Sequence, residues 1–421
     1  MIKSKNYLVG INKIIVKYGE TMKAKQFNND FINLIISSLF SKFGMAIYTI
    51  ALPLIVYDIT KSGSFMAITF VTEFMPHIIF SLFGGALADR MSKRSILLYG
   101  DVTSLCAVLF ILVTFLNGIE NIYILLIATF ILSSASAFYH PSFESVIPEM
   151  LDSSELVKGN SIFKFIETFT TFIGPSIGGL LIGFLGNVET LFVTMFTFLI
   201  SSISILLIKK PYINEHIDNE ISMFTSIKEG LNFVLKNKVI MSGTLYMFFI
   251  NVAYGFIEAL FVFYLKGEKH YSPSIIGYIF SIQTLGSMAS LYIVNKFKQI
   301  NRGKFIVYSG AIMCLGMLLL ALGNNIYIIV ISRILIVGSA TCMAISWFTL
   351  RQEVVPQQYL GRVISSTRMV AYLSLPISGL IAGLLINVVT ANTVFWFSTI
   401  SAIILTACYV KSNLTLYNSD N

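Results

Sequence analysis

Long apolar segments dominate this sequence and recur twelve times. Each is close to, or longer than, the roughly 20 residues with which an α-helix crosses a bilayer. Strands of a membrane barrel would instead alternate apolar and polar residues over about ten residues. We therefore predict an all-α polytopic membrane protein with twelve transmembrane helices. In chain order the segments are 31–57, 65–87, 96–116, 122–138, 165–184, 191–208, 239–265, 275–294, 305–322, 326–348, 363–388 and 394–410.

Composition supports lipid as the solvent of much of this chain. Only 12% of the residues are charged, whereas about a quarter of a soluble domain is charged. We expect no cleavable signal peptide, because the first apolar segment follows a polar stretch of 30 residues and lacks a small-residue cleavage site. The four cysteines lie inside apolar segments without paired spacing, so we expect neither disulfides nor a metal site.

The basic residues are distributed unequally between the two sides of the predicted helices. Counted from the N-terminus, 23 of the 29 lysines and arginines fall on the first side and three on the other, while Lys42, Arg333 and Arg368 fall within helices. The positive-inside rule therefore predicts that both termini are cytoplasmic in a bacterial cell membrane. This distribution explains the net charge of +8, so we expect no nucleic-acid partner.

The chain divides into two halves of six helices. A polar interruption with several acidic residues separates the sixth and seventh helices. We predict a basic N-terminal segment (1–30), a first bundle (31–208), a central linker (209–238), a second bundle (239–410) and a C-terminal tail (411–421). Two such bundles are typical of secondary transporters, whose solute site lies between the halves near the membrane midplane.

Short motifs repeat between the halves at similar offsets. A basic loop follows the second and eighth helices, an aliphatic residue with proline follows the fourth and tenth, and Pro-x-x-Gly lies in the fifth and eleventh. The offsets are 212, 208 and 201 residues, for Arg90/Arg302, Pro148/Pro356 and Pro175/Pro376. Similar offsets indicate a duplicated six-helix unit and two pseudo-symmetric bundles.

The loop between the second and third helices, Gly84–Arg94, carries the most specific motif. Glycines such as Gly85 allow close helix approach, and Asp89 can face the positive N-terminal end of a neighbouring helix. We expect Asp89 to act as a latch between two conformations. Alternatively, the loop only sets topology. The predicted switch residues are Gly85, Asp89, Arg90, Lys93, Arg94 and Asp101, the last close enough to pair with the loop.

This loop closely resembles the motif of the major facilitator superfamily, with Ser92 where glycine is usual. Other matches resemble the macrolide-efflux and enterobactin-exporter branch. They are Ala137-Phe138-x-x-Pro141, Ile147-Pro148-Glu149, Leu156-Val157-x-Gly159-Asn160-Ser161, Gly174-Pro175-Ser176-Ile177-Gly178-Gly179, Ala51-Leu52-Pro53-Leu54 with Thr60, and Val355-Pro356 with Gly361-Arg362-Val363. The resemblance implies two bundles, alternating access and, most often, proton-driven export.

One departure from that family concerns proton coupling. Many relatives carry an arginine in the fourth helix, whereas residues 124–138 contain no charge. Arg333 lies in the pseudo-equivalent region of the tenth helix. The coupling group must therefore be sought elsewhere.

Small residues line the fifth helix at helical spacing. Two small-x-x-x-small pairs permit tight crossing, and Pro175 frees a backbone carbonyl. The resemblance associates this pattern with exporters, although ordinary helix packing needs the same residues. The candidate packing residues are Gly174, Pro175, Gly178, Gly179 and Gly183, with Pro376 and Gly379 in the eleventh helix.

Ionisable residues inside helices are functional candidates, because their burial in a membrane is costly. Glu73 and His77 share one face of the second helix, and Glu258 lies one turn after Tyr254 in the seventh. The alternative is snorkelling or local pairing, which we favour for Lys164 and Glu167. The candidates for proton coupling or a substrate cavity are Glu73, His77, Tyr254, Glu258, Glu167, Arg333 and Arg368.

These features favour a secondary transporter. The chain contains no phosphate-binding Gly-x-x-x-x-Gly-Lys-[Ser/Thr] loop, so ATP does not drive it within this chain. We expect a monomeric proton antiporter without a cofactor that exports small amphipathic compounds such as drugs, macrolides or siderophore-like molecules. An uptake or facilitative carrier for a lysolipid or other metabolite is the alternative. A non-transporting sensor is more remote, as is a membrane enzyme, because no catalytic cluster is visible.

Overall fold

The computed structural model describes residues 29–151, 155–210, 223–297 and 299–416, without the side chains of residues 81–90, 141, 223–227 and 358. Every regular element in these ranges is helical. The helices are α2 (Asn29–Thr60), α3 (Gly63–Arg90), α4 (Lys93–Leu116), α5 (Ile122–Met150), α6 (Leu156–Leu185), α7 (Thr190–Leu206), α8 (Met223–Lys236), α9 (Lys238–Phe263) with the π-turn η1 (Tyr264–Glu268), α10 (Pro273–Ile282), α11 (Thr284–Lys296), α12 (Arg302–Leu322), α13 (Ile326–Val354), α14 (Gln357–Leu385), α15 (Ala391–Tyr409) and α16 (Asn413–Leu416).

The predicted membrane-spanning helices are present. Within the described ranges, eleven helical segments are long and apolar enough to cross a bilayer, with α9–η1 and α10–α11 each counting as one. The apolar helix α7, with 17 residues, corresponds to the predicted sixth segment. The all-α polytopic fold is therefore confirmed.

Four predicted helices end too early or begin too late in the sequence-based assignment. α5 continues to Met150 rather than residue 138, and α6 begins at Leu156 rather than residue 165. α13 continues to Val354 rather than residue 348, and α14 begins at Gln357 rather than residue 363. Hydropathy detects only the apolar part of a helix, whereas packing and capping keep its polar ends helical. Pro148 therefore lies within α5 instead of following it.

Serine and asparagine side chains fix where several helices begin. The Oγ of Ser92 accepts a hydrogen bond from the Ser95 amide at 3.3 Å and so caps α4. Asn237 accepts from the amides of Val239 and Ile240 at the start of α9. Such caps satisfy amides that the helix leaves unpaired. Capping gives Ser92 a local role at the position where the resembling family has glycine.

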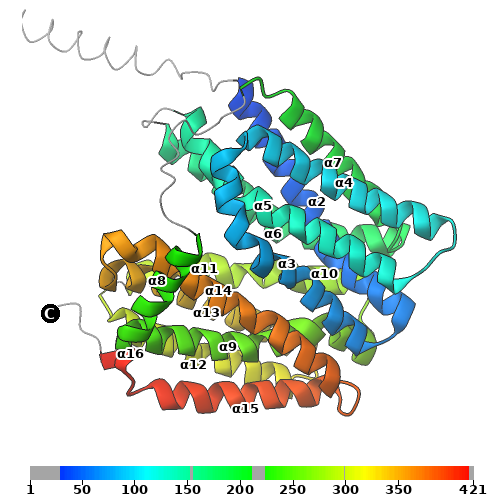
Figure 1. The fold of residues 1–421 in the computed structure, drawn as a ribbon. Helices are drawn as coiled ribbons and strands as arrows, with labels where there is room; N and C mark the ends of the chain where they lie inside the picture. The colour runs from blue at the N-terminus through cyan, green and yellow to red at the C-terminus, as the bar shows by residue number, and fades with distance from the viewer. Residues whose placement is uncertain (1–28, 152–154, 211–222, 298, 417–421) are drawn as a thin grey trace, which may run out of the picture.

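The helices pack as two bundles joined by two helix pairs. The first bundle contains α2–α7 and the second contains α9–α15. α6 packs on α10, and α3 packs on α14. We call the end carrying α8 the linker end and the opposite end the distal end. In Figure 1 the blue-to-green first bundle and the green-to-red second bundle meet toward the distal end, on the right, and diverge toward the linker end.

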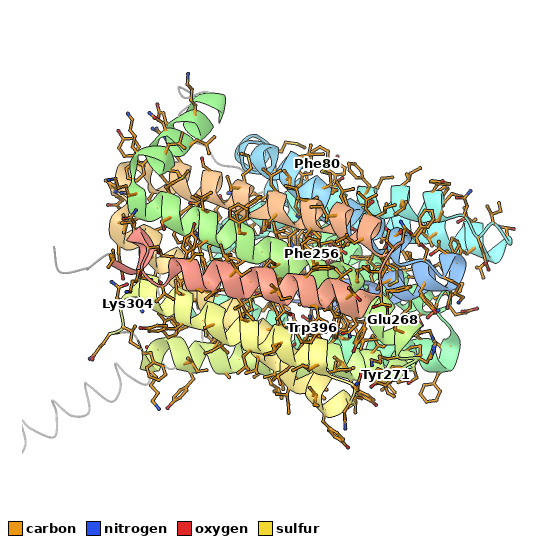
Figure 2. All side chains as sticks on the ribbon, turned by 90° about the horizontal axis from the view of Figure 1, so that it is seen from below. Phe80, Phe256, Glu268, Tyr271, Lys304 and Trp396 are labelled. Carbon is orange, nitrogen blue, oxygen red and sulfur yellow. The ribbon has the colours of Figure 1, made fainter. Side chains whose placement is uncertain are left out.

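Polar and apolar side chains are distributed as membrane insertion requires. Large apolar residues such as Phe110 and Leu116 are exposed on the outer faces of the helices. In Figure 2, Lys304 lies at the linker end of the second bundle, and Glu268 and Tyr271 lie at its distal end. The interior holds many small hydroxyl side chains. Some of them join helices by hydrogen bonds, as Ser37 of α2 does with Ser201 of α7.

The described part of the predicted C-terminal tail contains a short helix. Residues Asn413–Leu416 form the short helix α16, which packs on α12 and α9. Leu414 is fully buried there. The segment therefore anchors the chain to the linker end of the second bundle.

Candidate functional site

A cavity of about 150 Å³ lies between the two bundles and contains both carboxylates singled out in the sequence. Glu73 reaches it from α3, and Glu258 reaches it from α9. The remaining lining residues come from α2, α3, α9 and α10: Thr49, Leu52, Pro53, Met66, Thr69, Phe70, Phe74, Ala259, Val262 and Phe280. Residues 185 positions apart thus face one another across the bundle interface.

Glu258 is held by a cation of its own bundle. Its Oε1 lies 2.5 Å from Nη1 of Arg333 on α13, and the Arg333 Nε donates to Oε1 of Gln283 at 2.8 Å. The guanidinium also lies over the ring of Phe261, 4.2 Å from its centroid. Pairing, hydrogen bonding and stacking together offset the cost of burying a charge in a membrane protein. Tyr254 lies beside this pair, one turn along α9.

Glu73 has a different environment. In the described side chains it forms neither an ion pair nor a hydrogen bond, although it is only partly exposed. The buried Tyr48, whose hydroxyl bonds to Thr129 at 3.0 Å, lies close enough to Glu73 to interact with it electrostatically. One wall of the cavity therefore carries a paired carboxylate and the other an unpaired one.

His77 and His140, the two histidines of the predicted first bundle, lie on different helices, α3 and α5. His77 lies one turn from Glu73 on α3, as predicted, but the described residues contain no group of three or more histidine, cysteine or acidic side chains placed to hold a metal ion. His140 lies on α5, where its ring contacts Tyr139 edge-to-face.

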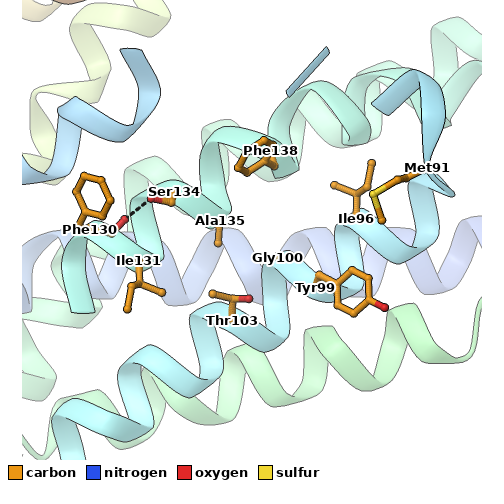
Figure 3. A pocket seen from close by; sticks show the side chains of 10 residues that line it. All are labelled: Met91, Ile96, Tyr99, Gly100, Thr103, Phe130, Ile131, Ser134, Ala135 and Phe138. Carbon is orange, nitrogen blue, oxygen red and sulfur yellow. Dashed lines mark hydrogen bonds between the residues drawn. The ribbon is translucent and has the colours of Figure 1, made fainter. Parts of the chain in front are cut away.

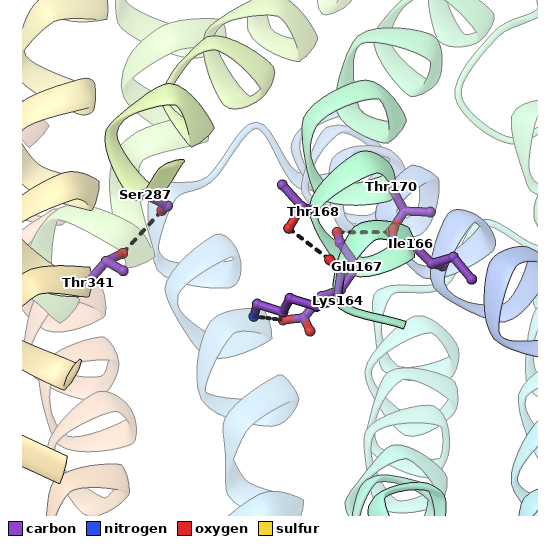
Figure 4. A network of polar contacts seen from close by, with 7 residues as sticks. All are labelled: Lys164, Ile166, Glu167, Thr168, Thr170, Ser287 and Thr341. Atoms are coloured by element: carbon purple, nitrogen blue, oxygen red, sulfur yellow. Dashed lines mark hydrogen bonds and ion pairs between the residues drawn. The ribbon is translucent and has the colours of Figure 1, made fainter. Parts of the chain in front are cut away.

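A second cavity, of about 270 Å³, lies on the linker-end side of the bundle interface. Lys164 and Glu167 line it from α6, opposite residues of α11 and Thr341 of α13. Figure 4 shows the Lys164–Glu167 ion pair, at 3.2 Å, and the Thr341–Ser287 hydrogen bond, at 3.1 Å. The predicted local pairing of Lys164 with Glu167 is confirmed. Both side chains are at least half exposed, so the pair contributes little to stability.

The glycines of α6 bring two other helices close. A β-carbon added at Gly178 would lie 3.3 Å from the Ile47 Cα, and one at Gly174 would overlap Ala46, both on α2. On the opposite face, a β-carbon at Gly179 would lie 3.0 Å from the Gly277 Cα of α10, and one at Gly183 would lie 2.9 Å from the Ser274 Oγ. The expected tight crossing is confirmed on both faces of α6.

Hydrogen bonds join α6 to the second bundle beside Pro175. The amide and hydroxyl of Ser176 lie 2.9 and 2.7 Å from the Ser281 Oγ. Pro175 has no amide hydrogen and so frees the carbonyl of Thr171. The Thr284 hydroxyl of the second bundle lies 3.5 Å from that carbonyl. The proline thus exposes backbone groups at the bundle interface.

The pseudo-equivalent crossing of α3 and α14 is also close. A β-carbon at Gly379, three residues after Pro376, would lie 2.7 Å from Cγ2 of Val71. Ser64 donates to the Gly383 carbonyl at 2.8 Å and contacts the Asn387 side chain at the same distance. Both crossings lie toward the distal end, so the bundles are closed there.

Two arginines of the second bundle differ in their surroundings. Arg368 is exposed on α14 and close enough to interact electrostatically with Arg351. Arg351 follows the predicted segment 326–348 and so is expected in a loop, but it lies in α13 and is buried. It donates to Thr367 at 2.7 Å and stacks on Trp347. The helix extends past the apolar segment, which explains the incorrect loop assignment.

The basic loop contacts neighbouring helices of the first bundle. Lys93 is buried and forms an ion pair with Glu149 at the end of α5. Arg94 donates to the Leu206 carbonyl at 2.8 Å, at the C-terminal end of α7, where a cation is favourable. The side chains of Gly85, Asp89 and Arg90 lie outside those described, so the latch remains a prediction.

Asp101 is surrounded by serine hydroxyls. Among the described side chains its partners are the hydroxyls of Ser201, Ser41 and Ser37, at 2.5, 2.9 and 3.5 Å. It lies eight residues after Lys93, or about 12 Å along the helix at 1.5 Å per residue. That depth explains why Glu149, rather than Asp101, pairs with Lys93.

Sequence reasoning missed the roles of Glu149 and Gln283. Glu149 belonged to a recognised motif, but the predicted helix ended before it. Gln283 lies between α10 and α11 and is uncharged, so the search for ionisable residues did not include it.

The family model described as Major Facilitator Superfamily matches residues 34–378 and 259–415. The chain belongs to this superfamily. Its members are transporters, and the chain is therefore a multi-pass membrane transporter rather than an enzyme.

Several relatives of this major facilitator are named as exporters. Macrolide efflux protein A of Streptococcus pyogenes is 24% identical over 364 residues, which cover 82% of this chain and 86% of the relative. The multidrug efflux pump Tap of Mycolicibacterium fortuitum is 22% identical, with 86% of this chain and 90% of the relative covered. The putative bacilysin exporter BacE of Bacillus subtilis is 24% identical over 76% of this chain and 79% of the relative.

Solved structures share the fold. The nucleoside transporter NupG has a TM-score of 0.75 and 13% identity, covering 93% of this chain and 100% of the other. A bacterial homologue of the iron transporter ferroportin, solved in an inward-facing state, has a TM-score of 0.69 and 16% identity, covering 91% and 98%. At these identities the structural similarity establishes only that this chain has the same fold as these transporters.

Proposed function

We propose that this transporter exports small amphipathic organic compounds in exchange for protons. The macrolide, multidrug and bacilysin exporters among its relatives support export of this solute class. Moving one elementary charge across the membrane supplies about 2.3 kcal/mol per 100 mV, which is sufficient to concentrate a solute outward.

The transporter lies in a bacterial cell membrane with its linker end and both termini in the cytoplasm. The excess of basic residues on that side supports this orientation. With this orientation, the close helix crossings at the distal end and the Lys164–Glu167 cavity on the linker-end side support an inward-open form.

The observation that carries the proposal is the cavity shared by Glu73 and Glu258. Glu258 has a compensating cation, Arg333, whereas Glu73 has no described partner. An unpaired carboxylate in a largely apolar wall is costly to keep charged, so a proton or a cationic group of the solute stabilises it. A proton and a solute therefore compete at this wall, as exchange requires.

Alternating access follows from rocking of the bundles about this cavity. The glycine-lined crossings of α6 with α10 and of α3 with α14 close the distal end. Opening these crossings while the linker end closes would expose the cavity to the other side. Close packing at both crossings makes each state discrete rather than graded.

Proteoliposome transport tests the coupling. A radiolabelled macrolide and a cationic dye are followed with and without an imposed pH gradient, in the wild type and the Glu73→Gln, Glu258→Gln double variant. We expect the double variant to lose gradient-driven transport and to retain solute exchange without net proton movement. Glu353→Gln, in a linker-end surface pair, is the matched control.

Full gradient response in the double variant would remove both carboxylates from coupling and direct attention to Glu167 or Asp101. Uptake that runs with the proton gradient in the same vesicles would favour the alternative carrier for a lysolipid or other metabolite. Susceptibility of a deletion strain to a panel of toxic compounds then identifies the solute class.

A further inference from the structure

A cavity of about 330 Å³ lies on the outer face of the first bundle, away from the bundle interface. Figure 3 shows its side chains, which come from α4 and α5 and from the turn before α4. Two of them face outward, because Tyr99 is 61% exposed and Ile131 is 42% exposed. The lining residues are Met91, Ile96, Tyr99, Gly100, Thr103, Phe130, Ile131, Ser134, Ala135 and Phe138.

The second bundle contains a cavity of about 320 Å³ between α11, α12 and α13. It also opens outward, beside Tyr308 and Ile312, which are 55% and 49% exposed. Both cavities reach the size range of small-molecule sites, about 300–1,000 Å³. We call them the first and second outer cavities.

The two outer cavities are built from equivalent positions of the repeated unit. Each α4 residue of the first has a counterpart 209 residues later on α12, and each α5 residue has one 204 residues later on α13. On α4 and α12 the pairs are Ile96/Phe305, Tyr99/Tyr308, Gly100/Ser309 and Thr103/Ile312. On α5 and α13 they are Phe130/Ile334, Ile131/Leu335, Ser134/Gly338, Ala135/Ser339 and Phe138/Cys342.

The side chains at these positions differ, yet the hollow is present in both bundles. A large residue in one cavity often corresponds to a smaller one in the other, as Phe138 does to Cys342. Among the equivalent pairs, only the outward tyrosine is the same residue in both. The recurrence of an outward-open cavity at equivalent positions indicates a shared use rather than a local packing defect.

The chemistry of the outer cavities favours an apolar chain, with an anionic end at the second. Among the described residues, neither lining contains a charged side chain. An exposed tyrosine stands at each opening, as amphipathic rings do at membrane interfaces. Cations stand beside the second cavity: the Lys296 Nζ lies 5.9 Å from the ring centre of Phe297, which lines it. Lys304 adjoins Phe305 of the second cavity and is exposed.

We propose that each outer cavity binds one acyl chain of a phospholipid from the linker-end leaflet, and that the second cavity selects an anionic one. There the head group meets Lys296 and Lys304. A bilayer surrounds these openings and supplies such chains, and a lysine near a membrane surface favours anionic lipid by about 1 kcal/mol, or about fivefold. This proposal does not depend on the transported solute or on proton coupling.

Native mass spectrometry of the purified transporter tests the sites, with phosphatidylglycerol or phosphatidylcholine added at matched concentrations. Wild type should retain two lipids and should hold one of them as phosphatidylglycerol in preference to phosphatidylcholine. Ala135→Phe and Ser339→Phe, at equivalent positions, fill one cavity each and should each remove one lipid. Ile127→Phe and Ile331→Phe, also equivalent and exposed on the same helices, should retain both.

A variant that removes surface charges tests the proposal even if the cavity-filling variants Ala135→Phe and Ser339→Phe fold poorly. Lys296→Gln with Lys304→Gln changes exposed residues only and should lower the preference for phosphatidylglycerol at one site by more than tenfold. Equal lipid counts in the filled and control variants would overturn the sites. Equal binding of both lipids by wild type would overturn anionic selectivity. Displacement of both lipids by a macrolide, one for one, would assign the cavities to solute.

Discussion

Glu258 of α9 and Arg333 of α13 form an ion pair in which Oε1 and Nη1 are 2.5 Å apart and the Arg333 side chain is only 1% exposed. The pair lies within the second bundle, whereas the Glu73 carboxyl facing the same cavity belongs to the first. The second bundle therefore carries its own charge compensation. This asymmetry between two pseudo-symmetric halves assigns different roles to the two carboxylates.

Removing one partner of this pair should destabilise the transporter strongly. Arg333→Met leaves Glu258 charged and uncompensated, and we expect a loss of about 3–5 kcal/mol in unfolding free energy. The Arg333→Met, Glu258→Met double variant should recover most of it. Arg302→Gln breaks a partly exposed pair and should cost about 0–1 kcal/mol. Denaturant titration in detergent measures the unfolding free energy of all three variants. Equal losses in Arg333→Met and Arg302→Gln would contradict the role of burial.

Enlarging the glycine at the distal crossing should hold the bundles apart. A Gly179→Leu side chain meets the Pro273 carbonyl oxygen at 2.5 Å and the Gly277 Cα at 3.0 Å, and backbone atoms cannot move aside cheaply. We expect transport to be lost and the distal end to open. The measurement is thiol labelling of Ser281→Cys in a cysteine-free background. Gly361→Ala, which meets no atom within 4 Å, is the control and should leave labelling low.

Asp89 should act on conformational cycling rather than on solute binding. The α3 backbone places it next to the last residue of the helix, far from the cavity at Glu73. Asp89→Asn should reduce transport strongly while the equilibrium affinity for solute stays within a few fold. Binding by scintillation proximity and transport in proteoliposomes separate the two. A large loss of affinity with normal transport would contradict the latch.

Both termini should be cytoplasmic. The motive is the 23-to-3 distribution of basic residues and the even number of helices. Reporter fusions near Lys25 and at Lys411 should both give cytoplasmic activity. An external response at either position would reverse or alter the topology, and the inward-open assignment would change with it.

The number of helices, their membrane character and the close crossing of α6 could be predicted from the sequence. Each apolar segment partitions into lipid by its own free energy, so its neighbours need not be known. The glycines at 174, 178, 179 and 183 are also local, because a helix without side chains on one stripe permits close approach regardless of which helix approaches.

Tertiary structure alone decided which residues meet. Glu258 pairs with a residue 75 positions later, and Glu73 shares its cavity although it lies in the other bundle. The C-terminal ends of α5 and α13 also depended on packing, because a hydropathy pattern does not detect their polar last turns. Contacts such as Lys93–Glu149 and Arg351–Thr367 stabilise these turns. The paired outer cavities are likewise shapes between helices. Sequence fixes which segments enter the membrane because partitioning is local, whereas sites and cavities arise from contacts between segments distant in the chain.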